Sequence, residues 1–300
     1  MPAPTQRATL DQLFATRDAY LRNVMWLNYA QWPEEYSVIG KLETSEKMKE
    51  VDFSIAELGM FAQKAEGAPI ELDSIEPSYS KTFLHLTWAR GVEITMEALE
   101  DDQDDVLGDQ MAALGYAARE TVETIAANEW LNNGHTTSTA MDGQPIYGTH
   151  TTAKGFVIVN TAAVDLDVPG VQTGLNYFAN LRTEAGNRMR LIPAVLIVSP
   201  ELSYAAHELV DSIQKPNTAD NNINSLQRFN LRVFVSHYMN SSTKWFMWVG
   251  ADMQKAKWYW RKRPVPVRDT RYSNQSALSG MLFRQSVGVS DYRTVWGSNP

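Results

Sequence analysis

Residues 105–131 carry the clearest hydrophobic pattern in the chain. Apolar side chains recur there at every third or fourth position, which is the spacing of one face of an α-helix. The pattern predicts a helix about 40 Å long at roughly 1.5 Å per residue, and the run Asn-Asn-Gly at 132–134 predicts its C-terminal stop. The apolar positions are Leu107, Met111, Leu114, Ala118, Val122 and Ile125.

Gly115 lies in the interior of this predicted helix. A glycine at such a position costs about 1 kcal/mol relative to alanine. The position tolerates that loss if the backbone of another segment approaches too closely for a side chain. A second backbone packed closely against the helix would therefore account for Gly115.

The first eighty residues follow two different patterns. Residues 8–32 are weakly amphipathic and predict a helix that ends at Pro33. Residues 34–80 mix polar and apolar positions, contain several glycines and include one short alternating run, VDFSIA. They predict a long extended excursion with little core of its own, and an excursion of that length usually serves a function or is disordered.

The remainder of the chain alternates strands and helices. Apolar and polar positions alternate from Phe83 to Met96, which predicts strands. Ser199 and Pro200 have the residue types of a helix N-cap and first turn. Together these runs predict an α+β fold. Further predicted strands are 156–160, 194–199, 231–239, 244–252, 257–271 and 280–298, and further predicted helices are 171–186 and 199–213.

Composition excludes several classes of protein. The chain has no cysteine, which excludes disulfides, thiolate metal sites and a cysteine nucleophile. Its longest apolar run, residues 191–198, is far shorter than the ~20 residues that span a bilayer. The N-terminal residues contain no apolar segment like that of a secretory signal. We therefore expect a protein of a cytoplasm-like compartment that does not enter a membrane.

The net charge of −8 argues against a dedicated nucleic-acid-binding protein, but the charge is unevenly distributed. Residues 93–130 contain eleven acidic side chains and a single basic one, whereas residues 255–293 contain nine basic side chains and two acidic ones. The two regions could attract each other within one chain or between neighbouring copies. The candidate contact residues are Asp101, Asp102, Asp104, Asp105, Arg261, Lys262, Arg263, Arg268 and Arg271.

Few patterns point to catalysis. The chain has no phosphate-binding loop, no dinucleotide-binding glycine motif and no nucleophile elbow. The run HELVD at 207–211 ends in Asp211 where a zinc-protease helix needs histidine. The run EDDQDD at 100–105 leads to Val106 where a calcium loop needs glycine, so its acids fit a solvated helix N-terminus better.

Two local clusters leave alternatives open. His135, Asp142 and His150 share one polar stretch and could bind the metal of an enzyme, although the run DGQP within it is also ordinary turn chemistry. Residues 258–271 interleave aromatic and basic side chains, as proteins that bind single-stranded nucleic acid do. Trp258 and Trp260 nevertheless have the spacing of side chains that pack on one face of a strand.

The order of several segments resembles the major capsid (head) protein of tailed bacteriophages, and in particular the Mu-type head subunit. The resemblance covers residues 80–298 and implies the Hong Kong 97-type capsid fold. It also implies a structural subunit without catalytic residues, metal or cofactor. The segments are LTWARGVEITMEALEDDQDD, LGYAARETVETIAANEWLNNG, MDGQPIYGTH, LIPAVLIVSPELSYAAHELVDS, NNIN, LRVFVSHYM, KWFMWVGAD and LFRQSVGVSDYRTVWGS.

The resemblance further implies a division of the chain. The parts are an N-terminal arm at 1–33, an extended loop at 34–82 that overlaps a neighbour, a peripheral domain at 83–170 with a spine helix at 104–132, an axial domain at 171–254, and a return to the peripheral domain with a C-terminal strand at 255–300. Lys64 in the extended loop is a candidate donor for a covalent cross-link between subunits.

The function implied is a shell of hexamers and pentamers that encloses double-stranded DNA in a virion assembled in the host cytoplasm. The expected partners are copies of the chain, a portal and a decoration protein. Relatives with a built-in scaffolding segment carry a long, charged helical N-terminal extension, whereas only about eighty residues precede the region of resemblance here. Either the scaffolding protein is separate, or this chain is a processed form, and Met1 favours a separate scaffolding protein. The alternatives are an encapsulin-like compartment shell, a metal-dependent enzyme and a nucleic-acid-binding module.

Overall fold

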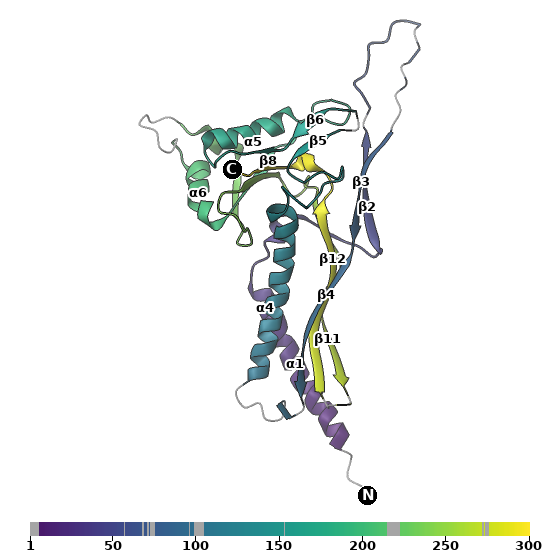
Figure 1. Ribbon diagram of the computed structural model, residues 1–300, viewed down its shortest axis with the longest axis vertical. Coiled ribbons are helices and arrows are strands. Elements are labelled where there is room, and N and C mark those ends of the chain that lie inside the picture. The colour runs from purple at the N-terminus through teal and green to yellow at the C-terminus, as the bar shows by residue number, and fades with distance from the viewer. Residues whose placement is uncertain are drawn as a thin grey trace. The chain divides into compact units, whose positions relative to one another are not determined.

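The structure, a computed structural model, describes residues 6–56, 58–67, 69–70, 72, 76–95, 97–98, 105–152, 154–214, 223–271, 273 and 276–300. It divides into two compact units, each built from three separate stretches of chain (Figure 1). We call residues 1–34, 85–124 and 260–285 the helix-pair unit. We call residues 35–84, 125–259 and 286–300 the sheet unit.

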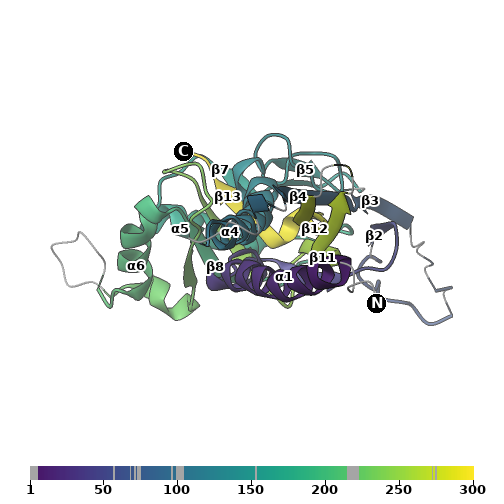
Figure 2. The ribbon, with the colours of Figure 1, turned by 90° about the horizontal axis from the view of Figure 1, so that it is seen from below.

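The helix-pair unit contains α1 (Gln6–Gln31), most of α4 (Val106–Ala127) and the strand β4 (Leu86–Thr95). It also holds parts of β11 (Ala256–Arg271) and β12 (Ser276–Val289), and β12 pairs antiparallel with β4. Figure 2 shows α1 and α4 next to each other and beside these strands. An apolar core joins the elements through Leu21, Met25, Tyr29, Ile94, Leu107, Met111, Leu114, Ala118 and Met281.

A second backbone does pack closely against Gly115. A β-carbon at this position would lie 2.2 Å from the Met25 carbonyl oxygen and 3.2 Å from the Tyr29 amide nitrogen. The backbone of α1 therefore occupies the space that a side chain on α4 would need. The predicted end of α1 is confirmed, because the helix ends at Gln31, before Pro33.

The sheet unit is built on a five-stranded sheet of order β7-β13-β10-β8-β9. The central strand β10 pairs antiparallel with both β8 and β13, and β9 runs parallel to β8. Every residue of β10 is buried, as expected for a strand covered on both faces. The strands are β7 (Thr161–Ala162), β8 (Pro193–Val198), β9 (Arg232–Val235), β10 (Trp245–Val249) and β13 (Val295–Ser298).

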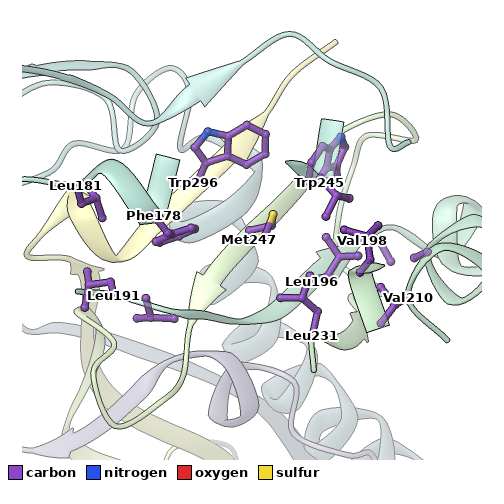
Figure 3. Packing of buried hydrophobic residues seen from close by; sticks show 14 of the residues in the cluster. Phe178, Leu181, Leu191, Leu196, Val198, Val210, Leu231, Trp245, Met247 and Trp296 are labelled. Atoms are coloured by element: carbon purple, nitrogen blue, oxygen red, sulfur yellow. The ribbon is translucent and has the colours of Figure 1, made fainter. Parts of the chain in front are cut away.

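Two helices, α5 (Val168–Asn180) and α6 (Ser203–Asp211), cover this sheet. Figure 3 shows the core between them, where Phe178 and Val210 from the helices meet Leu196, Met247 and Trp296 from the strands. The absence of a side chain at Gly174 lets α5 approach, since a β-carbon there would lie 2.6 Å from the Met247 sulfur.

The predicted limits of both helices are partly wrong. α5 begins at Val168, where the Asp167 carboxylate accepts a hydrogen bond from the Gly170 amide, and it ends at Asn180. The predicted continuation to 186 fails because the chain turns back, with the amide of Thr183 bonded to the Asn187 carbonyl and Gly186 at φ +85°. The second helix begins as a 3₁₀ turn, η2 (Pro200–Leu202), and the Ser199 side chain makes no cap hydrogen bond.

The predicted excursion at residues 34–80 begins with residues that are part of the folded unit and not with an extended segment. Residues 36–44 form the short helix α2 (Tyr36–Ile39) and the strand β1 (Lys41–Thr44), and the Tyr36 ring packs 4.9 Å from the ring of Trp258. The strand β1 lies at the edge of a four-stranded sheet of order β1-β11-β12-β4. The excursion proper is the ribbon of β2 (Lys49–Ala56) and β3 (Glu76–Leu84), which are antiparallel (Figure 1).

The remaining elements are short. A single turn of π-helix, η1 (Asn128–Asn132), follows α4 and places the ring of Trp130 between those of Trp248 and Trp258. The strands β5 (Thr149–Thr151) and β6 (Val157–Val159) pair, and two 3₁₀ turns lie at η3 (Ser225–Phe229) and η4 (Tyr292–Thr294). Within the described residues, no helix combines the length and the apolar character that a membrane span requires.

Candidate functional site

Asp142 and His150 belong to a turn that internal polar contacts hold in place. The Nδ1 atom of His150 lies 2.8 Å from Asp142 Oδ2, and its Nε2 atom lies 3.3 Å from the Ile146 carbonyl oxygen. The imidazole is fully buried and stacks on the Tyr292 ring with 3.8 Å between ring centroids. Both ring nitrogens therefore have partners inside the protein, and neither is directed at a ligand.

The third histidine of the predicted metal cluster is packed as an aromatic side chain. The ring of His135 lies 4.8 Å from that of Tyr147 and 5.8 Å from that of Phe246. Burial, and to a smaller extent the charge of Lys244, lower the pKa of His135 to about 4. In the part of the chain that the structure describes, no group of three His, Asp or Glu side chains could hold a metal ion.

The acidic start of α4 is described only in part. Asp101, Asp102 and Asp104 lie outside the described residues. Asp105 directly precedes the helix, accepts a hydrogen bond from the Tyr20 hydroxyl at 2.6 Å and has φ +54°. Farther along α4, Asp109, Tyr116 and Glu120 are exposed, so the helix presents an acidic face to solvent.

Arg119, the one basic residue among these acids, is buried and binds groups inside the protein. Its guanidinium donates to the Tyr29 carbonyl oxygen and to Glu34 Oε1, both at 3.0 Å, and lies 3.7 Å from Glu123. The guanidinium also lies over the Tyr29 ring, 4.1 Å from the ring centroid. Arg119 thus fastens the end of α1 to α4 and does not neutralise the exposed acids.

The basic strand β11 separates its aromatic and basic side chains. Trp258 and Trp260 are buried, which confirms that they pack and leaves neither ring open for base stacking. Lys262, Arg263, Arg268 and Arg271 are exposed and Arg261 is partly buried. Arg271 already has a partner in its own chain, since its Nη1 atom lies 3.4 Å from Glu93 Oε1.

A polar cluster that sequence reasoning missed joins the β2–β3 ribbon to β11. The Nζ atom of Lys257 lies 2.7 Å from Asp52 Oδ2 and 3.1 Å from the Tyr259 hydroxyl. The Ser290 hydroxyl donates to the same carboxylate. No local signal could have revealed this cluster, because Asp52 and Lys257 are far apart in sequence and each looks like an ordinary strand residue.

Hydrogen bonds and charge in this cluster favour the ionised form of the Asp52 carboxylate. Burial acts to raise the pKa of Asp52, but the hydrogen bonds from Lys257, Ser290 and Tyr259 and the charge of Lys257 outweigh it. The pKa of Asp52 consequently lies below its ordinary value. Burial and the neighbouring carboxylates raise the pKa of Tyr259, which therefore stays protonated and donates a hydrogen bond.

Within the described residues, the predicted histidine, acidic and basic groups thus do not come together as a catalytic or metal site. The family of the chain follows from its similarity to known proteins. A sequence model of the phage capsid protein family matches residues 80–296. The chain belongs to the phage capsid protein family. No curated protein matches it.

Solved structures share the fold of this capsid protein at low sequence identity. A Microbacterium phage Oxtober96 structure is 10% identical with a TM-score of 0.57, over 90% of this chain and 93% of that chain. The capsid structure of Cyanophage P-SCSP1u is 10% identical with a TM-score of 0.58, over 89% and 88%. A virus-like particle from Pyrococcus furiosus is 8% identical with a TM-score of 0.55, over 93% and 98%.

The predicted family and fold are therefore confirmed. The α+β capsid protein has the Hong Kong 97-type architecture of phage capsids, and it is a structural subunit of a shell. Its place is in the capsid of a virion. A shell subunit functions through contacts between copies, and exposed side chains make those contacts.

The loop of the β2–β3 ribbon in the capsid protein exposes apolar side chains. Phe61 is fully exposed, and Met60 and Leu72 are nearly so. Lys64 is also exposed in this loop, as a cross-link donor would need to be. Asn187 holds the near end of the loop through a hydrogen bond to the Leu58 carbonyl oxygen at 3.1 Å.

Proposed function

We propose that this chain is the major capsid protein of a tailed bacteriophage. It assembles into hexamers and pentamers, and these form an icosahedral shell around double-stranded DNA. The observation that carries the proposal is the match of residues 80–296 to the phage capsid protein family. The subunit has no catalytic activity, needs no cofactor and is assembled in the host cytoplasm.

The proposed division of the chain follows the family layout given above. The second half of α1 packs against its own subunit through Leu21, Met25 and Tyr29, so these residues are anchored in the subunit. The extended loop, placed at 34–82, is supported most directly by the exposed side chains beyond β2. The axial domain at 171–254 supplies the strands β8, β9 and β10.

We place one set of subunit contacts between the acids that precede α4 and the bases of β11 in a neighbouring copy. The exposed acids at Asp109 and Glu120 extend the acidic face along the helix. Lys262 and Arg263 are the best-placed bases, because both are exposed and Arg271 already binds Glu93. Exposed ion pairs contribute roughly 0.2–1 kcal/mol each, so these contacts select orientation more than they supply affinity.

Other partners follow from the family. We propose a separate scaffolding protein, a portal and a decoration protein, and DNA that is enclosed without sequence-specific binding. One similar solved capsid, that of bacteriophage JBD30, is decorated with minor capsid protein trimers. Lys64 is the proposed donor of any cross-link between subunits. A covalent ladder in denatured particles that disappears in Lys64→Arg would support that role, and an unchanged ladder would contradict it.

A compartment shell that encloses protein is the second candidate. The fold likeness to the virus-like particle from Pyrococcus furiosus keeps this candidate open, because fold alone does not distinguish a shell around protein from a shell around DNA. The family match favours the phage capsid. Nuclease-protected DNA in particles recovered from an infected host would decide for the phage capsid, and particles filled only with protein would decide for the compartment.

Negative-stain electron microscopy of the purified protein, with mass from light scattering, tests the shell itself. Closed shells, or rings of five and six copies, are the expected result. A monomer or dimer at every salt and protein concentration, also when a candidate scaffolding protein is added, would overturn the proposal. Lys262→Glu with Arg263→Glu should raise the protein concentration needed for assembly, and most strongly at low salt.

A further inference from the structure

The helix-pair unit contains an apolar slot between α4 and the β4–β12 pair. The slot has a volume of about 310 Å³. The side chains that matter most in its lining are Trp88 and Arg90 of β4, Leu114 and Ala117 of α4, and Met281 and Phe283 of β12. All of these residues belong to the same unit.

The slot is a part of the core that this chain does not fill. On the α4 side its lining includes the small residues Ala117, Ala118 and Thr121, which leave room where larger side chains would reach the sheet. Alternate positions of β4 lie on one face of the strand, and on that face Val92 and Ile94 pack into the core. Trp88 lies on the same face but remains 37% exposed.

Arg90 gives the slot a charge. It lines the slot beside apolar side chains. A guanidinium held next to an apolar cavity favours an occupant that brings a carboxylate together with an apolar side chain.

The loop of the β2–β3 ribbon has both features. Phe61 is fully exposed and Met60 is 84% exposed, while Glu66, a few residues later, is also exposed. Large exposed apolar side chains on a subunit that forms shells are expected to become buried on assembly. Aromatic side chains that enter a pocket of a partner are typical of the residues that dominate binding.

We propose that, in the assembled shell, the slot of one copy receives the Phe61 side chain of a second copy, with Glu66 of that second copy beside Arg90. This inference rests on the proposed shell function. A second copy supplies one loop for every slot, so each contact has a partner at equal stoichiometry. The contact joins different surfaces of the two copies, and contacts of that kind generate rings.

Covalent trapping tests the pairing directly, because the chain contains no cysteine. Met60→Cys and Ala117→Cys in one chain keep Phe61 in place and, treated with a short bifunctional maleimide after assembly, should give a ladder of linked subunits on a denaturing gel. The matched control pairs Met60→Cys with Ala113→Cys, because Ala113 is exposed on α4 but lies outside the slot. No ladder in intact shells, or an equal ladder in the control, would overturn the pairing.

Assembly itself gives a second measurement. Phe61→Ser should weaken the subunit contact about 30-fold, the factor expected on loss of a dominant interface residue. Phe53→Ser, at an exposed position on β2 outside the loop, should have a much smaller effect. Ala117→Phe should block the slot, whereas Ala113→Phe should not. Equal assembly by both members of either pair would refute the inference.

Charge exchange checks the proposed ion pair. Arg90→Glu and Glu66→Arg should each impair assembly, and the double variant should recover it. Failure of the double variant to recover would remove Glu66 from the contact. If the wild-type chain forms no shells or rings, the proposed function fails; if it does and the variants do not differ, the function stands and this contact is wrong.

Discussion

In the five-stranded sheet every side chain of β10 is buried, whereas the β2–β3 ribbon and its loop expose Phe53, Met60 and Phe61. Both regions belong to the sheet unit and both have apolar residues in strands or next to them. The sheet uses its apolar side chains to hold one subunit together. The ribbon leaves its apolar side chains for something outside the subunit. Apolar content alone therefore does not distinguish a core from a contact surface.

The largest expected contrast comes from truncating one aromatic residue in each region. Trp296→Ala removes a buried ring that packs 4.9 Å from Trp245, and it should lower the free energy of unfolding by about 3–5 kcal/mol. Phe61→Ala should change the free energy by less than about 0.5 kcal/mol in the unassembled subunit. Urea unfolding of the unassembled protein measures both, and a similar loss in the two variants would remove the contrast.

The polar cluster at the base of the ribbon should have the next largest effect. Asp52→Asn removes the nearer of the two carboxylates beside Lys257, the other being Glu43 at 4.0 Å, and should cost about 2–3 kcal/mol. Glu46→Gln, an exposed carboxylate just before β2, is the matched control and should be neutral. Hydrogen exchange should rise selectively in β2 and β3. Unchanged exchange there would mean that the cluster does not hold the ribbon.

The pH dependence of this cluster has a defined sign. The pKa of Asp52 is lower in the folded chain than its ordinary value of about 3.9. The stabilisation is therefore complete above pH ~4 and is lost as the pH falls through the lower, folded pKa. Asp52→Asn should flatten the loss of stability in that acidic range, and an unchanged profile would contradict the assignment.

A smaller effect is expected in the helix-pair unit. Gly115→Ala gains about 1 kcal/mol of helix propensity, but the new β-carbon collides with the Met25 carbonyl oxygen. We expect a net loss of about 1–2 kcal/mol, because packed backbones do not separate freely. Gly250→Ala is the control, since a β-carbon there meets only Ala194 at 3.7 Å. A more stable Gly115→Ala variant would show that α1 and α4 are loosely joined.

The smallest effect at neutral pH is expected at His135. His135→Phe conserves the aromatic packing and should change stability by less than about 1 kcal/mol at pH 7. The wild-type pKa of about 4 lies below the ordinary value, so the unfolded chain binds more protons between pH ~6.5 and pH 4. As the pH falls over that range, the free energy of unfolding of the wild type should decrease, and that of His135→Phe should decrease less. Identical pH profiles would place His135 outside the core.

Much of the fold could be predicted from local patterns. The periodic spacing around Leu114 gave α4, and Gly115 predicted the close approach of a second backbone that α1 provides. The family resemblance rested on the order of segments and was confirmed. The helix limits near 171 and 186 were wrong because Asp167 and Gly186 set them through local hydrogen bonds and a positive φ.

Pairings between distant segments could not be predicted. Alternation from Phe83 to Trp88 predicted strands but not the buried side, and Phe83 and His85 are buried while Leu84 and Leu86 are exposed. The contact of Asp52 with Lys257 depends on the arrangement of β2 and β11, which no local pattern encodes. The proposed metal cluster at His135 failed for the same reason, because nearness in sequence did not bring three ligands together.

The position of β13 sets a time at which the subunit becomes complete. This strand lies inside the five-stranded sheet, between β7 and β10, although its residues, 295–298, come last among the strands in sequence. Until a ribosome has made and released those residues, β10 lacks one of its two neighbouring strands, and the aromatic core around Trp245 stays open. A nascent chain is therefore expected to complete this sheet only after its synthesis has passed β13.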